Sequence, residues 1–239
     1  MIRFLIVGIL MLSTAGMHAG KLLENSRSHR ALNRVKRRLI KKLEDQNLKW
    51  GSPIYLRIFK AENVLEVWIH NDDRFHLFNT YEVCTYGGKG LGPKCRQGDG
   101  KAPEGFYFVT PNQMNPYSSY HLSFNIGYPN RFDQAHGRTG GSIMVHGDCV
   151  SIGCIAMTDE KIEEIYSLAY AALKNGQPYF RVHIFPFRMT PERMKMYEKS
   201  EWIAFWENLK IGYDFFFDHN HNPPNVTIEK KKYVFNEID

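Results

Sequence analysis

A series of short strand-like runs, separated by very short connections, constrains the fold of this chain more than any other feature. The first three runs cover residues 54–60, 64–70 and 75–84. Their connections, Ala61-Glu62-Asn63 and Asn71-Asp72-Asp73, are of hairpin length, so the runs predict neighbouring antiparallel strands. Further strand candidates are residues 105–110, 122–128, 142–146 and 179–185.

Helical spacing of apolar residues is confined to two segments of this body. The first follows Thr158 and ends at Gly176, and the second begins at Thr190-Pro191-Glu192 and is expected to continue through residues 201–209. The pattern therefore predicts a mainly β fold with appended helices, of the α+β class. Beyond Tyr213 we expect an irregular flap without an assigned role.

The composition places the chain among ordinary globular proteins. Of its 239 residues, 43% are hydrophobic and 23% are charged, which excludes a disordered or collagen-like chain. The net charge of +6 is unevenly distributed, because residues 21–49 carry ten Lys or Arg against three Asp or Glu. The body from Trp50 onward is close to neutral, so the charge gives no reason to expect a nucleic-acid partner.

The basic arm at residues 20–50 has the pattern of an amphipathic helix. Its apolar residues recur at helical spacing, with Lys and Arg on the other faces: Leu32, Val35, Leu39 and Leu43. Two interpretations remain open. The arm either contacts an anionic surface peripherally through residues 21–49, or covers the domain with its apolar stripe while its charges face solvent.

The N-terminal segment has the pattern of a secretory signal. An apolar run at residues 4–12 follows Arg3 and is too short to span a bilayer, and Ala19 offers a cleavage site. We therefore expect an exported protein. The predicted organisation is a signal peptide at 1–19, the arm at 20–50, a catalytic domain at 51–213 and a tail at 214–239.

The segment that carries candidate chemistry covers residues 142–157. A strand delivers His146 and Gly147, and the chain returns eight residues after the histidine with Gly153 and Cys154, just before a predicted helix. An imidazole that takes a thiol proton, and backbone amides that hold an oxyanion, are what a cysteine nucleophile needs. The spacing therefore favours a cysteine-dependent enzyme.

Other interpretations of this segment stay open at this level. His146, Cys149 and Cys154, joined by His136, could bind zinc, although no Cys-x-x-Cys pair is present. Cys149 and Cys154 could instead form a disulfide or be buried thiols, and the glycines could serve only a turn.

Two motifs in this order resemble the L,D-transpeptidase (YkuD) catalytic-domain family. Val145-His146-Gly147 followed by Ser151-Ile152-Gly153-Cys154 is similar to that family's His-Gly and Ser/Thr-His-Gly-Cys signature. Ala102-Pro103-Glu104-Gly105-Phe106-Tyr107 is similar to its Thr-Pro-x-Gly-x-Phe segment. The sequence around these motifs resembles that of the YafK-type periplasmic subgroup. The resemblance runs from about Gly51 to Tyr213.

The resemblance implies an L,D-transpeptidase-like β-sandwich that acts on peptidoglycan stem peptides containing meso-diaminopimelate. It makes Cys154 the nucleophile, His146 its base and the Gly147 carbonyl the group that orients the imidazole. The amides of Gly153 and Cys154 would hold the oxyanion, and Ser151 would brace the loop. No metal and no organic cofactor is implied.

The sequence departs from the family pattern in two respects. Ile152 stands where most members have a second histidine, and the segment between His146 and Cys154 is shorter than in the cross-linking enzymes. The YafK-type subgroup shares both features and resembles an amidase that cuts the bond between diaminopimelate and a Braun-type lipoprotein. The alternatives are a transpeptidase that forms cross-links or attaches protein, and a non-catalytic wall-binding module.

Basic residues near these motifs are candidates for binding stem-peptide carboxylates, because a guanidinium or ammonium can pair with a carboxylate. The candidates are Lys94, Arg96, Lys101 and Arg131, each of which could instead be a solvated surface charge, and His136, which could line the cleft or pack in a turn. A catalytic thiol in an exported protein must stay unpaired, so the other three cysteines can form at most one bridge. We expect Cys84 to pair with Cys95, eleven residues away across a glycine-rich loop.

Overall fold

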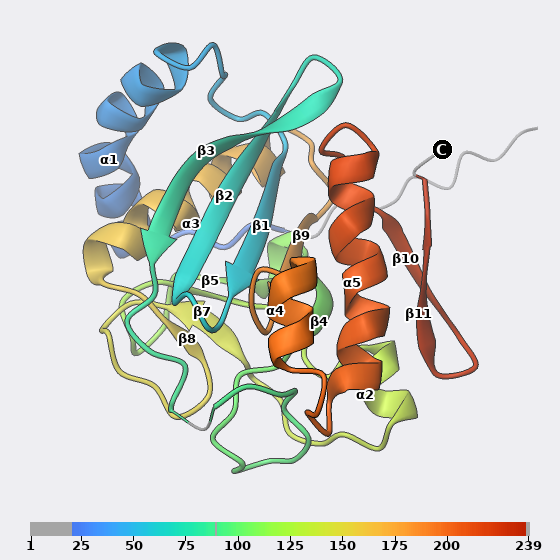
Figure 1. Cartoon of the computed structure of the whole chain (residues 1–239). Helices are drawn as coiled ribbons and strands as arrows, with labels where there is room; N and C mark the ends of the chain where they lie inside the picture. Colours follow the sequence, from blue (N-terminus) through green and yellow to red (C-terminus); the bar gives the residue numbers. More distant parts are fainter. Residues whose placement is uncertain (1–20, 89, 238–239) are drawn as a thin grey trace, which may run out of the picture.

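The computed structural model describes residues 21–88 and 90–237. The predicted signal peptide lies outside the described residues. Figure 1 shows a central twisted sheet with helices on both sides and a small hairpin near the C-terminus. No helix within the described ranges is both long enough and apolar enough to cross a membrane.

The larger sheet has five strands in the order β3-β2-β1-β9-β4. Their bounds are Ile54–Phe59 (β1), Val64–Asn71 (β2), Arg74–Glu82 (β3), Gly105–Val109 (β4) and Phe180–Phe185 (β9). The hairpins β1–β2 and β2–β3 confirm the antiparallel pairs predicted from their short connections. Strand β9 is inserted between β1 and β4 and runs parallel to β1, a pairing that no local pattern indicated.

The smaller sheet has four short strands in the order β5-β6-β7-β8, and it carries the candidate catalytic segment. Its strands are Met114–Asn115 (β5), which follows the 3-10 turn Pro111–Gln113 (η1), Ser123–Asn125 (β6), Met144–His146 (β7) and Ile155–Ala156 (β8). Strands β7 and β8 are parallel, so the connection between them must leave one end of the sheet and return to the other.

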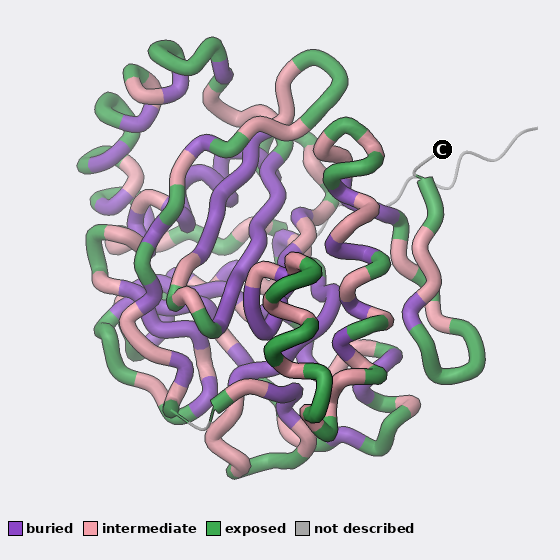
Figure 2. The backbone as a smooth tube through the Cα atoms, in the orientation of Figure 1, coloured by how far each residue is buried: buried purple, intermediate pink, exposed green. Residues whose placement is uncertain are grey.

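The helices cover the two faces of the larger sheet. Helices α1 (Ser26–Glu44) and α3 (Asp159–Lys174) belong to one hydrophobic core with the smaller sheet. Helices α4 (Pro191–Met196) and α5 (Ile203–Asp218) cover the opposite face, where an aromatic core includes Phe59, Phe185 and Trp206. In Figure 2 the inner strands β1, β2 and β9 of the larger sheet are mainly purple, the colour of buried residues, while the edge strand β3 is mostly pink and green.

The basic arm forms helix α1, and its apolar stripe is buried against the domain. Of the predicted stripe, Val35, Leu39 and Leu43 are buried and Leu32 is half-buried, and Ala31 is buried beside them where α1 packs on α3. Two ion pairs reinforce the contact, Arg34 to Glu163 at 2.9 Å and Arg38 to Glu164 at 2.6 Å. The structure thus has the arm covering the domain, as the second interpretation of the arm expected.

Two sequence expectations about the C-terminal third are wrong. The helix expected to continue from residue 191 through 209 is two helices, because residues 197–202 form turns between α4 and α5. The tail is also more regular than expected: α5 extends to Asp218, and strands β10 (Asn225–Glu229) and β11 (Lys232–Asn236) form an antiparallel hairpin. The Tyr233 ring stacks on Phe132 of the short helix α2 (Arg131–Ala135), with centroids 4.1 Å apart, so tertiary packing orders this tail.

Candidate active site

The register of the smaller sheet brings the predicted base and nucleophile to neighbouring strands. Val145 pairs with Ile155 and His146 with Ala156. Continuing this register by one residue places Cys154 beside Met144, whose N–H points to Cys154 Sγ at 3.4 Å. Residues two apart on a strand share a face, so Cys154 lies diagonally across from His146 on one face of the sheet.

His146 is held by its own neighbour in the chain. Its Nδ1 lies 2.6 Å from the Gly147 carbonyl oxygen, and its side chain is almost wholly buried, with the residue 3% exposed. A carbonyl can only accept a hydrogen bond, so Nδ1 carries the proton and Nε2 of the neutral ring presents its lone pair. Burial lowers the pKa of His146, opposed by the Gly147 carbonyl and the charge of Asp148.

The thiol of Cys154 is half-buried in this structure. Burial raises the pKa of Cys154, while the Met144 amide and the charge of Lys94 act in the opposite direction. Within the described chain no hydrogen bond joins Sγ to the His146 ring, and the thiol is oriented to donate weakly to the Ser142 carbonyl, at 3.7 Å. The two pKa directions favour a resting pair of neutral thiol and neutral imidazole over a preformed thiolate.

The loop before the nucleophile is braced by Ser151. Its hydroxyl donates to the Cys154 carbonyl at 2.9 Å and accepts from the Gly153 N–H at 3.0 Å. The Gly153 amide, which the sequence suggested as an oxyanion donor, is therefore already engaged. No hydrogen bond in residues 21–88 and 90–237 uses the Cys154 N–H, which leaves that amide available to an oxyanion.

Gly153 cannot be replaced without strain. Its φ is +144°, a region that residues with a Cβ rarely adopt, and a Cβ there would lie 3.3 Å from the Lys101 carbonyl oxygen. The residue-100 loop and the nucleophile loop are thus in close backbone contact.

A buried ion pair anchors that neighbouring loop. Lys60 Nζ donates to Glu104 Oε1 at 2.9 Å, and to the carbonyls of Gly92 and Ala102. Glu104 also accepts from the Trp206 Nε1 at 2.8 Å, so both charges are fully compensated inside the protein. Glu104 belongs to the second family-like motif, but no local pattern indicated that it pairs with Lys60, the residue directly after β1.

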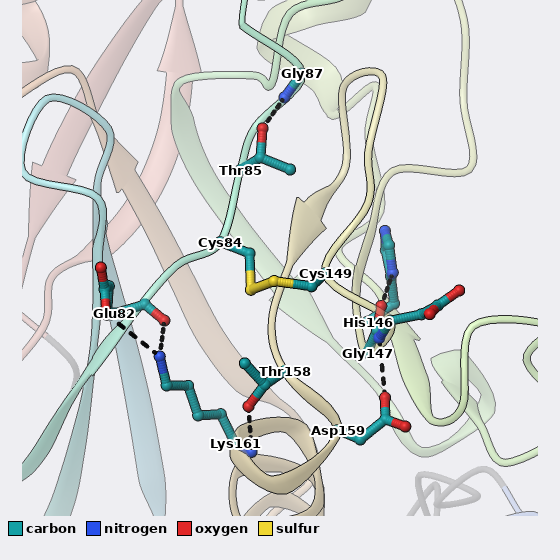
Figure 3. The surroundings of a disulfide bond; sticks show 11 residues. Glu82, Cys84, Thr85, Gly87, His146, Gly147, Cys149, Thr158, Asp159 and Lys161 are labelled. Atoms are coloured by element: carbon teal, nitrogen blue, oxygen red, sulfur yellow. Dashed lines mark hydrogen bonds and ion pairs between the residues drawn. A yellow bond between two sulfur atoms is a disulfide. The ribbon is translucent and has the colours of Figure 1, made fainter.

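A disulfide between Cys84 and Cys149 corrects the predicted pairing of Cys84 with Cys95. The Cα atoms of the bonded pair are 5.3 Å apart although 65 residues separate them in the chain (Figure 3). Their backbones flank strand β8, because Cys84 N donates to the Ala156 carbonyl and Cys149 N to the Met157 carbonyl. Pairing follows proximity across strands, which sequence separation does not show.

The disulfide also decides between the open interpretations of the cysteines. Cys95 and Cys154 are free, and Cys149 is unavailable both to Cys154 and to a zinc ion. Within the described residues, no group of three His, Cys, Asp or Glu side chains is arranged to hold a metal ion.

Two of the predicted cationic residues lie near the nucleophile but are already partnered. Lys94 is buried and pairs with Asp99 at 2.7 Å, and its charge still acts on Cys154. Lys101 Nζ donates to the Leu91 carbonyl at 3.1 Å, while its backbone faces Gly153. Both side chains hold the loop at residues 91–101 in place.

The other three predicted substrate-binding residues are not brought together with Cys154 by any described contact. Arg96 is exposed. Arg131 lines a separate cavity of about 640 Å³, between β4, β9 and the C-terminal hairpin, which neither Cys154 nor His146 lines. His136 caps α2, with Nδ1 2.8 Å from the Phe132 carbonyl and its ring against the Phe132 ring. Arg96 and Arg131 were suggested by their charge and by their nearness to the motifs in the chain, and of the two possibilities for His136 the structure shows packing in a turn.

A turn at residues 116–122, which the sequence did not single out, forms one wall beside His146. The Tyr120 ring packs on the His146 ring with centroids 4.9 Å apart. The carbonyls of Tyr120 and Leu122 both accept from the Gly147 N–H, at 3.1 and 3.2 Å. This turn is tied to the arm, since Arg27 Nη1 donates to the carbonyls of Ser118 and His121 at 2.6 Å.

The described fold and site place this chain in a known class. Residues 53–184 match the L,D-transpeptidase catalytic domain, YkuD, and the chain belongs to that family. The family match covers the larger sheet from β1 to β9 and both candidate catalytic residues. The fold is therefore the YkuD-like α+β fold that the motifs predicted.

Among individual proteins, the chain is 49% identical over 184 residues to the provisionally named L,D-transpeptidase YafK of Escherichia coli strain K12. The match covers 77% of this chain and 74% of that protein, and the same figures hold for the YafK of strain O157:H7. The YafK-type resemblance seen in the sequence is thus confirmed.

Solved structures are more distantly similar. The helical cell shape determining protein Pgp2 of Campylobacter jejuni, as its K307A mutant, aligns over 81% of this chain and 66% of its own with 21% identity and a TM-score of 0.45. Bd1075 of Bdellovibrio bacteriovorus aligns over 68% of this chain and 61% of its own, with 23% identity and a TM-score of 0.40.

Proposed function

We propose that this chain is a periplasmic cysteine amidase that cuts the bond between meso-diaminopimelate and the C-terminal lysine of a Braun-type lipoprotein. The observation that supports it most is the protonated Nδ1 of His146 held by the Gly147 carbonyl, on the same sheet face as Cys154. That arrangement places the lone pair of Nε2 on the same sheet face as a free thiol in a protein of the L,D-transpeptidase family.

The proposed reaction has two halves. Nε2 of His146 takes the thiol proton while Cys154 Sγ attacks the diaminopimelate carbonyl carbon, and the Cys154 N–H stabilises the oxyanion. The carbon–nitrogen bond then breaks as His146 returns the proton to the leaving lysine amine. Water, deprotonated by His146, attacks the thioester and yields the diaminopimelate carboxylate and the free thiol.

The loop composition supports water over an amine as the acceptor. Ile152 is 91% exposed and Val150 is also exposed, so the tip of the loop has two apolar side chains. A hydrocarbon side chain has no group that could hydrogen-bond to an incoming amine. A histidine at this position would have one in its ring nitrogens. Water is small enough for His146 alone to hold and deprotonate it, so it needs no such group on the loop.

Sacculi that carry covalently bound lipoprotein test this proposal directly. The purified protein should release the lipoprotein and leave diaminopimelate with a free carboxylate, and Cys154→Ala should release none. Cys95→Ala, the matched change at the other free thiol, should release as much as the wild type. Sacculi that keep all their bound lipoprotein after incubation with the wild type would contradict the amidase proposal.

The same incubation separates two alternatives. A transpeptidase, which the family name favours, would consume an added amine acceptor and form new cross-links or protein attachments. A wall-binding module would sediment with sacculi and give neither a product nor a thioester at Cys154. Such a module would also need neither the free thiol nor the oriented imidazole on the same sheet face.

We further propose that the N-terminal segment exports the protein and that the outer face of α1 contacts an anionic surface. Arg30, Arg37 and Lys41 are exposed on this helix, and its first turn contains no acidic residue. Exposed charges are screened over about 8–10 Å at physiological salt, so such binding should weaken as salt rises.

A further inference from the structure

The peptide unit between Gly147 and Asp148 is hydrogen-bonded at both ends. Its carbonyl oxygen accepts from His146 Nδ1 at 2.6 Å, and its N–H, which belongs to Asp148, donates to Asp159 Oδ1 at 2.9 Å. Figure 3 shows the Asp159 carboxylate pointing at this peptide from one side and the His146 ring from the other. The imidazole and the carboxylate are therefore joined through one rigid amide plane.

Asp159 is fixed where it can make this contact. It is the first residue of α3, directly after the N-cap Thr158, whose side chain accepts from Lys161 N. Met157, which directly precedes the N-cap, donates its N–H to the His146 carbonyl at 2.8 Å. The start of α3 is therefore tied to the strand that carries the histidine. Helix and strand thus hold Asp159 and His146 at a set separation.

Gly147 is the residue that lets the carboxylate approach. A Cβ at this position would lie 2.5 Å from Asp159 Oδ1 and 3.0 Å from His121 Cβ. Any side chain would therefore displace either the carboxylate or the turn at residues 116–122. This gives a physical reason for glycine in the Val-His-Gly motif that is independent of turn geometry.

Bonding of an amide N–H to a carboxylate has two effects on the carbonyl of the same peptide. The charge-assisted bond fixes the peptide plane, and it polarises the amide so that the carbonyl becomes a stronger acceptor. A stronger, fixed acceptor holds the imidazole in the tautomer with a free Nε2, as outer carboxylates do for ligating or catalytic histidines.

We propose that Asp159 is a positioning residue for His146 and acts through the Gly147–Asp148 peptide. This inference rests on the proposed role of His146 as the base. Other groups that face His146 are Asp148 next to it in the chain, Tyr120 from the turn, and Cys154 from the neighbouring strand. Asp159 differs from these in being bonded to the peptide that orients the ring.

Three variants separate this role from helix capping. Asp159→Ala removes the acceptor, Asp159→Asn keeps an oxygen acceptor without the charge, and Glu160→Ala removes the adjacent exposed carboxylate from the same first turn of α3. The first readout is the NMR signal of the His146 Nδ1 proton, assigned by its loss in His146→Gln. The second is the rate at which iodoacetamide alkylates Cys154, followed on its own peptide by mass spectrometry.

We expect Asp159→Ala to broaden or shift the Nδ1 proton signal and to slow alkylation at pH 7 by about tenfold, which corresponds to about 1.4 kcal/mol. Asp159→Asn should keep the signal and stay within about threefold of the wild type, and Glu160→Ala should match the wild type. An unchanged signal and rate in Asp159→Ala, or an equal loss in Glu160→Ala, would overturn the inference.

The readouts do not depend on the hydrolysis that we propose. If the wild type leaves sacculi intact yet the Asp159 variants change the His146 proton and the Cys154 alkylation rate, the amidase proposal fails and the positioning role stands. If the protein releases lipoprotein while Asp159→Ala behaves as the wild type in both readouts, the reverse holds. Should Asp159→Ala fail to fold, Asp159→Ser replaces it with the same expected results, because its side chain ends one bond short of the oxygen that accepts from the Asp148 N–H. An unchanged proton signal and alkylation rate in Asp159→Ser would overturn the inference.

Discussion

Cys149 is bonded to Cys84, so the loop between the candidate base and the candidate nucleophile is covalently attached to the chain just after β3. The bonded cysteine is five residues before Cys154 and three after His146. Its φ of +47° and the φ of +66° at Asp148 show that the loop turns sharply here. The crosslink therefore restrains the part of the loop that has no strand partner.

Breaking this bond should lower the stability of the protein. We expect Cys84→Ser to lower the free energy of unfolding by about 2–4 kcal/mol, because the crosslink closes a long loop in the unfolded chain. Urea denaturation measures this loss, and Cys95→Ser serves as the control with no bridge to break. Thiol titration of the denatured, non-reduced wild type should find two free thiols, and four would contradict the disulfide.

Replacing the nucleophile or its base should remove activity without unfolding the protein. Cys154→Ala should lower amide cleavage by about 10³-fold or more, and His146→Ala should lose nearly as much, because the two act as a unit. Cys154 is half-buried and the change is small, so the melting temperature of Cys154→Ala should stay close to that of the wild type. Full activity in either variant would refute the assigned roles.

The pH dependence of kcat/KM should reflect the neutral resting pair. Burial lowers the pKa of His146, and the base must be unprotonated, so activity should persist as the pH falls below the usual histidine value of about 6.5. The acidic limb should therefore lie below that value. Because burial also raises the pKa of Cys154, a pH titration of thiolate absorbance should show the thiol protonated at pH 7. A thiolate signal at pH 7 would favour a preformed ion pair.

The two roles of the arm can be separated with substitutions on opposite faces of α1. Leu39→Ala removes a buried side chain and should destabilise the protein by about 2–4 kcal/mol in urea denaturation. Changing Arg30, Arg37 and Lys41 to Gln should leave that stability unchanged and weaken binding to anionic vesicles at low salt. If the Gln variant binds vesicles as the wild type does at every salt concentration, α1 serves only to cover the domain.

Local patterns in the sequence predicted the parts of the fold that depend on near neighbours in the chain. The hairpins of β1, β2 and β3 and the start of α3 after Thr158 follow from alternation, connection length and capping, which act over a few residues. The two family-like motifs also predicted the YkuD family. The Ala-Pro-Glu-Gly segment, His146 and Cys154 follow one another in the sequence, so their order can be recognised without a structure.

The sequence alone determined that this is an α+β protein of the YkuD family with a basic, amphipathic arm. Only the tertiary structure decided which partners meet: Cys84 with Cys149, Arg27 with the turn beside Tyr120, and Asp159 with the peptide that holds His146. These contacts depend on how β3, α1 and α3 pack around β8 and the smaller sheet. A hydrogen bond or a disulfide acts over a few ångströms in space, and that separation has no fixed relation to distance along the chain.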